Sequence, residues 1–174
     1  GSIAQSGQQR DAMWAVREGI PAANRRIGGI ASHDISLPLS EIPQFLEEAR
    51  QAILAIAPLR INAFGHLGDG NLHYNIFPPK GETRDSYKPL ASRLSELVYE
   101  MVSARNGSFS AEHGVGRIKR GALKTFGDQV RVATMKTIKA AIDTIGIMNP
   151  GAVLDLQLRV ADLPRVRFPL WKFA

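Results

Sequence analysis

The 174-residue chain contains no cysteine and no long hydrophobic run. Without cysteine, a disulfide framework and thiolate chemistry are excluded, which is consistent with a reducing compartment. The longest apolar stretches, such as residues 53–58, are far shorter than the roughly 20 residues that span a bilayer, so we expect no transmembrane segment. The first residues also lack the basic and apolar regions of a signal peptide.

Aromatic residues make up only 7% of the chain, and basic residues form no long block. The net charge of +6 is scattered except at residues 117–120, and it is not interleaved with aromatic side chains. Nucleic-acid binders usually cluster their basic residues on one face, so we expect no nucleic-acid partner. A hydrophobic content of 44% and a charged content of 22% are typical of one soluble globular domain.

Hydrophobic periodicity predicts an α+β fold with an antiparallel β-sheet and helices packed mainly on one face. The predicted helices cover residues 11–24, 40–58, 86–105, 122–126 and 128–145. The predicted strands cover residues 27–38, 59–66, 72–77 and 108–111. The second and third of these strands are separated by a short glycine-containing turn, which favours antiparallel over parallel pairing.

The turn at Asp69-Gly70 is typical of a two-residue hairpin connection. That turn predicts cross-strand pairs in which Leu67 faces Leu72 and His66 faces His73, with Asn75 on the face of His73 and opposite Phe64. Two opposed imidazoles can converge on one metal ion, although the histidines of a plain hairpin would have no such role.

A carboxylate and an imidazole stand side by side at Glu112-His113, just before the Gly-Val-Gly of residues 114–116. Two histidines need a further ligand to complete a metal site, so Glu112 is the candidate third ligand and His113 the candidate base. Glu112-His113 could instead be an exposed ion pair. The glycines of residues 114–116 could present backbone N–H groups to an anion, or they could simply form a turn.

Four segments together resemble motifs of one family, the C-terminal domain of FAD-linked oxidases, which includes D-lactate dehydrogenase, the glycolate oxidase flavin subunit and D-2-hydroxyglutarate dehydrogenase. The segments are residues 14–18 (WAVRE), 66–73 (HLGDGNLH), 112–116 (EHGVG) and 148–154 (MNPGAVL). The resemblance covers residues 3–154 and implies ferredoxin-like elements in the fold.

The resemblance implies a function that the residue patterns alone do not give. Family members oxidise D-2-hydroxy acids to 2-oxo acids, pass a hydride to FAD, and then pass electrons to a quinone or an electron-transfer flavoprotein. FAD would be bound mainly by an N-terminal domain that this chain has no room for, so we expect a substrate-binding cap fragment that is inactive alone. A second copy of the chain, in a homodimer, is a further possible partner. We expect a cytoplasmic location, with attachment at the inner membrane left open and a mitochondrial location in a eukaryote.

The resemblance also assigns roles to individual residues. His66, His73 and Glu112 would bind a divalent metal such as zinc, and His113 would accept the hydroxyl proton. Arg17 would pair with a substrate carboxylate, Asn75 would hydrogen-bond the substrate, and Asn149 would approach the flavin. Two of these residues have structural interpretations as well: an exposed helix residue for Arg17 and a simple turn for Asn149.

Two departures from the family pattern bear on the substrate. Hydroxyglutarate-specific members carry a threonine where this chain has Pro21, and a lysine before the Asp-x-Ser-Leu-Pro segment where this chain has Ser32-His33. A short acid such as D-lactate is then at least as plausible as D-2-hydroxyglutarate, unless Arg25, Arg26 or His33 binds the second carboxylate.

The tail of residues 155–174 continues beyond the family pattern, and its role stays open. Two other functional classes also stay open for the chain as a whole. One is a stand-alone metal-dependent hydrolase or lyase with a metal-bound water as nucleophile. The other is a non-catalytic ligand-binding or assembly module.

Overall fold

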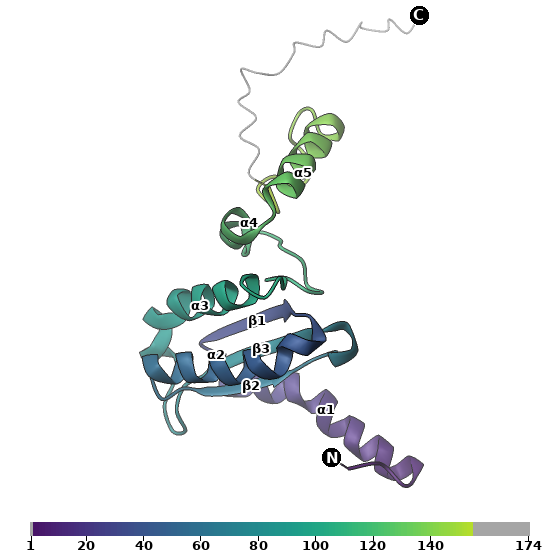
Figure 1. Ribbon diagram of the computed structural model, residues 1–174, viewed down its shortest axis with the longest axis vertical. Helices are drawn as coiled ribbons and strands as arrows, with labels where there is room; N and C mark the ends of the chain where they lie inside the picture. The colour runs from purple at the N-terminus through teal and green to yellow at the C-terminus, as the bar shows by residue number, and fades with distance from the viewer. Residues whose placement is uncertain (1, 155–174) are drawn as a thin grey trace, which may run out of the picture. The chain divides into compact units, whose positions relative to one another are not determined.

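A computed structural model describes residues 2–154, which divide between His113 and Gly114 into two compact units (Figure 1). The predicted tail, residues 155–174, lies outside the described residues. None of the described helices combines the length and apolar character that a bilayer-spanning helix requires.

The first unit is built around a three-stranded antiparallel sheet in the order β1-β3-β2 (Figure 1). Its strands are β1 (Ala31–Ser36), β2 (Arg60–Phe64) and β3 (Asn71–Phe77). Its α-helices are α1 (Gly7–Ile27), α2 (Ile42–Ile56) and α3 (Ala91–Ser103). The predicted α+β class and antiparallel pairing are confirmed, and β3, from the predicted hairpin, is the central strand.

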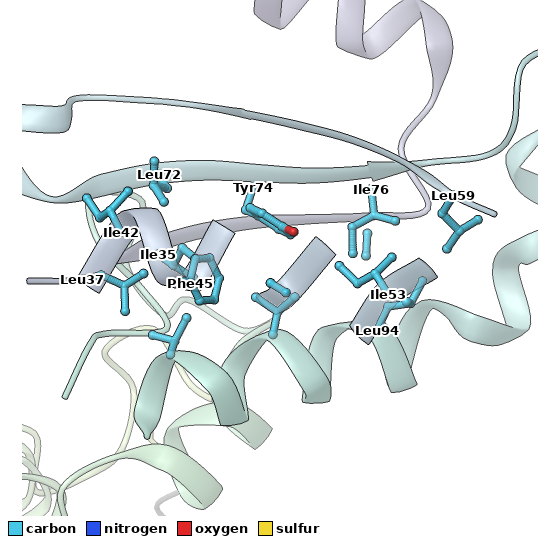
Figure 2. Close-up of a cluster of buried hydrophobic side chains, with 14 residues drawn as sticks. Ile35, Leu37, Ile42, Phe45, Ile53, Leu59, Leu72, Tyr74, Ile76 and Leu94 are labelled. Atoms are coloured by element: carbon cyan, nitrogen blue, oxygen red, sulfur yellow. The ribbon is translucent and has the colours of Figure 1, made fainter. Parts of the chain in front are cut away.

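One face of the sheet carries the hydrophobic core. Side chains at alternate strand positions, including Ile35, Tyr74 and Ile76, point toward Phe45 of α2 and Leu94 of α3, all of them fully buried (Figure 2). Burying a side chain of this size contributes about 1.5–3 kcal/mol, so this face accounts for much of the stability of the unit. Helices α2 and α3 pack here, as the sequence predicts.

The opposite face of the sheet is polar, and α1 lies against it. In Figure 2 the purple ribbon of α1 passes on the side of the strands away from the core side chains. The amide of Asn24 lies 3.5 Å from Oδ1 of Asn62, and the Arg17 guanidinium is 5.4 Å from the centre of the Phe64 ring. No side chain of α1 is buried, so α1 adds polar groups to this face rather than core.

The predicted hairpin register is wrong by two positions. Phe64, not His66, lies opposite His73, and Asn75 lies opposite Asn62. The connection is longer than a two-residue turn because Leu67–Asp69 forms a 3-10 helix, and Gly70 then adopts a left-handed backbone with φ of 69°. A Cβ atom on Gly70 would stand 2.1 Å from the carbonyl oxygen of Leu37, so this loop is shaped by its contact with the end of β1.

Three other element boundaries differ from the prediction. Helix α1 continues through Pro21 to Ile27, since proline costs the helix one hydrogen bond without obliging it to end. The predicted helix of residues 86–105 begins as a 3-10 helix, Arg84–Leu90, which contains Pro89. The predicted strand of residues 108–111 forms only a single bridge, between Ser36 and Ser108.

The second unit contains α4 (Arg120–Phe126) and α5 (Gln129–Ile142). Asp128 caps α5 by accepting the backbone N–H of Arg131 at 2.7 Å, as the sequence predicts. After α5, the Asp143 carboxylate accepts the backbone N–H groups of Ile147 and Met148 at 2.9 and 3.0 Å. These bonds shape the loop that precedes Asn149.

Candidate functional site

The polar face of the sheet places a histidine between an acid and an aromatic ring. Because β3 is central, His73 has a direct neighbour on each side: Asp34 of β1 and Phe64 of β2. The Phe64 and His73 ring centres are 5.1 Å apart. Directly paired residues share one face of a sheet, so these side chains point away from the hydrophobic core.

A segment after α3 brings Glu112 and His113 to the same place. Ser36 and Ser108 exchange two backbone hydrogen bonds of 2.9 and 2.8 Å, and Ala111 donates to the carbonyl of Asp34 at 3.1 Å. We call residues 108–113 the strap, because they run along the outer edge of β1. The strap starts where Gly107 passes so close to β1 that a Cβ atom would stand 2.5 Å from the Ser36 carbonyl oxygen.

The three predicted metal ligands lie together despite the shifted register. Nε2 of His73 is 3.0 Å from Oε1 of Glu112, and Nε2 of His66 is 3.9 Å from Oε2 of the same carboxylate. The two imidazole centres are 6.2 Å apart. His66 follows β2 by two residues, so it still lies beside His73 without being paired with it.

The two histidine–carboxylate distances are close to those between neighbouring ligands of one metal ion. Zinc binds imidazole nitrogen and carboxylate oxygen at about 2.0–2.2 Å, which places neighbouring ligand atoms about 3.3 Å apart in a tetrahedral site. The observed separations, 3.0 Å from His73 to Oε1 of Glu112 and 3.9 Å from His66 to Oε2, lie on either side of that value. Two histidines and one glutamate leave a fourth position for water or substrate, as in catalytic zinc sites.

The described donors that lie closest together are not the same set as the three predicted ligands, because they include His73 and Glu112 but not His66. Asp34, His73, Glu112 and His113 each offer one ligand atom, and these atoms all lie within 4.8 Å of one another. With His66, which lies 3.9 Å from Glu112, the site has five potential donors, more than a three-residue metal site needs. The surplus groups, Asp34 and His113, need other roles.

The surroundings of His73 favour its neutral form, which is the form that binds a metal. Burial lowers the pKa of His73 below its ordinary value, and this outweighs the opposing effects of Glu112 and Asp34. A neutral imidazole has a free lone pair, which is the form that coordinates metals. Burial raises the pKa of Asp34, but hydrogen bonds and the His113 charge outweigh it, so the pKa falls and the carboxylate stays ionised.

His113 lies at the solvent-exposed side of the cluster. Its ring stacks on His73 with centres 5.4 Å apart and an interplanar angle of 14°. Its Nε2 lies 3.6 Å from Glu112, yet 65% of the side chain is exposed. This combination of proximity and exposure suits a group that accepts a proton from a molecule bound beside the metal ligands.

The two predicted substrate-binding residues flank this cluster. Arg17 of α1 lies over Phe64, which in turn contacts His73. Asn75 is two residues along β3 from His73 and donates its amide hydrogens to the His73 carbonyl at 3.1 Å and, more weakly, to the Asn62 carbonyl at 3.5 Å. The structure thus places a half-buried cation and a buried amide on the face that carries the histidines.

Asn149, predicted to approach a flavin, belongs to the second unit. Its backbone has a φ of 46°, and its Oδ1 accepts a hydrogen bond from Arg117 at 3.2 Å. The N–H of Val153 donates to the carbonyl of Gly116 at 2.7 Å, so the glycine loop and the Asn149 segment hold each other.

One alternative from the sequence is removed and one residue was missed. His33 is buried on the core face, where Nδ1–H donates to the Tyr74 carbonyl and Nε2 accepts from the Ser95 hydroxyl, so it cannot bind a second substrate carboxylate.

The sequence analysis did not identify Asp34 as part of the site. Strand alternation was the available signal, since it puts Asp34 on the face opposite His33 and therefore on that of the paired histidine.

Comparisons with known proteins point to one family. The family described as "FAD linked oxidases, C-terminal domain" matches residues 1–153. A D-2-hydroxyglutarate dehydrogenase of Stutzerimonas stutzeri is 38% identical over 160 residues, covering 88% of this chain and 33% of the relative. A mitochondrial D-2-hydroxyglutarate dehydrogenase of Arabidopsis thaliana is 38% identical over 158 residues, covering 91% and 27%. A D-2-hydroxyglutarate–pyruvate transhydrogenase of Saccharomyces cerevisiae is 32% identical over 158 residues, covering 86% and 31%. The chain spans a third or less of the length of these relatives.

Proposed function

Because the chain belongs to the family of C-terminal domains of FAD linked oxidases, we propose that residues 3–154 form the substrate-binding part of a flavin-dependent D-2-hydroxy-acid dehydrogenase. The complete flavoprotein would convert a D-2-hydroxy acid to the 2-oxo acid. FAD would be bound mainly outside this chain, with Asn149 near the flavin.

The observation that carries the proposal is the convergence of His66, His73 and Glu112, with His113 stacked beside them. Arg17 adds a cation over Phe64, at the border of the same cluster. A 2-hydroxy acid presents a hydroxyl group and a carboxylate on neighbouring carbons. The site offers a metal-binding set and a base for the first group, and a cation for the second.

The reaction requires the loss of one proton and one hydride from the substrate. When bound, a divalent metal at His66, His73 and Glu112 would polarise the substrate hydroxyl, and FAD would accept the hydride from Cα. His113 takes the hydroxyl proton on an imidazole nitrogen, so that the C–O bond becomes a carbonyl as the hydride leaves. Arg17 holds the carboxylate with charge-assisted hydrogen bonds, and Asn75 orients the substrate from β3.

Anaerobic mixing of the complete flavoprotein with D-lactate and, separately, with D-2-hydroxyglutarate tests the proposal. We expect the absorbance of oxidised flavin to disappear with at least one of the acids. Prior removal of metal by a chelator should abolish this change, and stoichiometric zinc should restore it. Flavin that stays oxidised with every D-2-hydroxy acid would refute the dehydrogenase assignment, whereas reduction that survives complete metal removal would refute the metal site only.

The substrate that we propose is a short 2-hydroxy acid. The names of the relatives point to a dicarboxylate, D-2-hydroxyglutarate. Two positions argue against this preference here. Pro21 cannot supply a hydroxyl donor on α1, and Ser32, which pairs directly with Asn75 on the site face, cannot supply an ammonium group.

We expect the substitution Ser32→Lys to shift the ratio of kcat/KM values about ten- to a hundredfold toward D-2-hydroxyglutarate relative to D-lactate. A hydrogen bond to a charged group contributes about 1.5–3 kcal/mol, which corresponds to that range. Steady-state kinetics of the complete flavoprotein with both acids provide the measurement. Ser40→Lys, at an exposed position before α2, is the matched control and should leave the ratio unchanged. A wild-type enzyme that already prefers D-2-hydroxyglutarate by tenfold or more would show that Arg25, Arg26 or another cation binds the second carboxylate.

A further inference from the structure

We infer that Asp34 is a positioning residue of the metal site: its buried carboxylate holds the main chains that carry Glu112 and His66 in place for metal binding. The inference goes beyond the proposed function, on which it rests for the metal itself. Asp34 would act through the ligands rather than as one of them.

The first observation is the set of hydrogen bonds that Asp34 accepts. Its side chain is 5% exposed. Oδ2 accepts the backbone N–H groups of Glu112 and His113, at 3.0 and 2.8 Å. Two consecutive N–H groups of the strap thus point at one carboxylate oxygen, which fixes the peptide planes on both sides of Glu112.

The second observation links the same carboxylate to His66. Oδ1 of Asp34 accepts the amide of Asn71 at 2.9 Å, and the amide oxygen of Asn71 accepts the backbone N–H of His66 at 3.3 Å. Asn71 is buried, so water does not compete for these bonds. One carboxylate therefore organises two segments that are far apart in the sequence and that each supply a metal ligand.

The third observation concerns the remaining ligand, His73. Asp34 is its cross-strand partner, and Oδ1 of Asp34 lies 3.8 Å from Nδ1 of His73, while Nε2 of the same ring faces Glu112. Carboxylates commonly stand on this side of metal-binding imidazoles, where they fix the ring orientation. Asp34 therefore hydrogen-bonds the backbone of Glu112, is linked through Asn71 to the backbone of His66, and lies beside the ring of His73.

The same contacts argue against Asp34 as a ligand. Both of its oxygens already face N–H donors: one amide at Oδ1 and two backbone groups at Oδ2. Three of the roughly four lone-pair positions of the carboxylate therefore already accept hydrogen bonds, and both lone pairs of Oδ2 are used. Glu112, whose side chain is 43% exposed, has its oxygens directed at the histidines instead.

The substitution Asp34→Asn tests this role with almost no change in shape. Asparagine offers one oxygen and one NH2 group, so either the Asn71 amide or the two strap N–H groups must face a donor. We expect the zinc affinity of the 174-residue chain to fall about ten- to a hundredfold, the range typical for groups that support metal ligands. Competition with a chromophoric chelator measures the affinity. Asp85→Asn removes the same charge at an exposed position of the first unit and should bind zinc as the wild type does.

Hydrogen exchange of the metal-free chain provides a readout that is independent of metal. In Asp34→Asn we expect faster exchange at the amides of Glu112 and His113, with the core strand β3 still protected. Asn71→Ala serves as the second variant if Asp34→Asn does not fold, and it should weaken zinc binding by loosening His66 while the strap amides stay protected. Wild-type zinc affinity in either folded variant would overturn the inference. A wild-type chain that binds no zinc would instead remove the proposed metal site, and this inference with it.

Discussion

Replacing His73 with alanine is expected to leave the chain without stoichiometric zinc and to slow flavin reduction in the complete flavoprotein about a hundred- to ten-thousandfold. His73 is the least exposed of the three proposed ligands and the one closest to Glu112, at 3.0 Å. Its loss leaves only two ligands, too few for a protein zinc site. Polarisation of the hydroxyl by a metal supplies several kcal/mol, which corresponds to that range of rates.

Metal analysis of purified His73→Ala and single-turnover flavin reduction provide the measurements. The thermal midpoint of the metal-free variant, compared with that of the metal-free wild type, serves as the control for folding. A full equivalent of zinc in the variant would show that zinc binding does not depend on His73.

Replacing His113 with alanine is expected to lower kcat about a hundred- to ten-thousandfold while the zinc content stays the same. General-base catalysis by a positioned side chain contributes an effect of this size. The substitution removes only the ring, because Asp34 binds His113 through its backbone N–H. The strap, which includes Glu112, therefore keeps its hydrogen bonds to Asp34.

Chemical rescue separates proton transfer from a structural role of His113. Added imidazole should restore part of the rate of His113→Ala, since a free base can enter at an exposed position. The same addition should leave Ser40→Lys, an exposed substitution outside the site, unaffected. An unimpaired kcat in His113→Ala would assign the base to another group.

The sequence predicted the elements of the first unit because their patterns are local. Alternation along β3 and helical spacing in α2 each reflect a single buried face, and both elements occur where they were expected. The strap was harder to predict. Ser108 pairs with Ser36 in a single bridge, and this contact depends on the path of the chain after α3 rather than on any alternating pattern.

The hairpin register shows where local reasoning stops. Asp69-Gly70 has the composition of a two-residue turn, but the N–H of Leu37 donates to the carbonyl of Gly70 at 3.0 Å. This contact joins positions far apart in the sequence and favours the longer loop. His66 and His73 still come together, because the shift of two positions keeps both residues on the same side of the sheet.

The candidate site was predictable in its ligands but not in its supports. His66, His73 and Glu112 are chemically conspicuous, since few other side chains bind transition metals. Asp34 and Asn71 are common strand and turn residues whose importance depends on what they face across the sheet. Their role could only be derived once the pairing of β1 with β3 was known.

The strap also affects how the protein behaves toward other copies of itself. An open strand edge presents free N–H and C=O groups that can pair with another chain and seed aggregation. Here the strap occupies the outer edge of β1, through the bonds of Ser36 to Ser108 and of Ala111 to Asp34. The same six residues that present Glu112 and His113 therefore cover this edge of the sheet against pairing with another chain, so a change in the strap would affect both the site and the β1 edge.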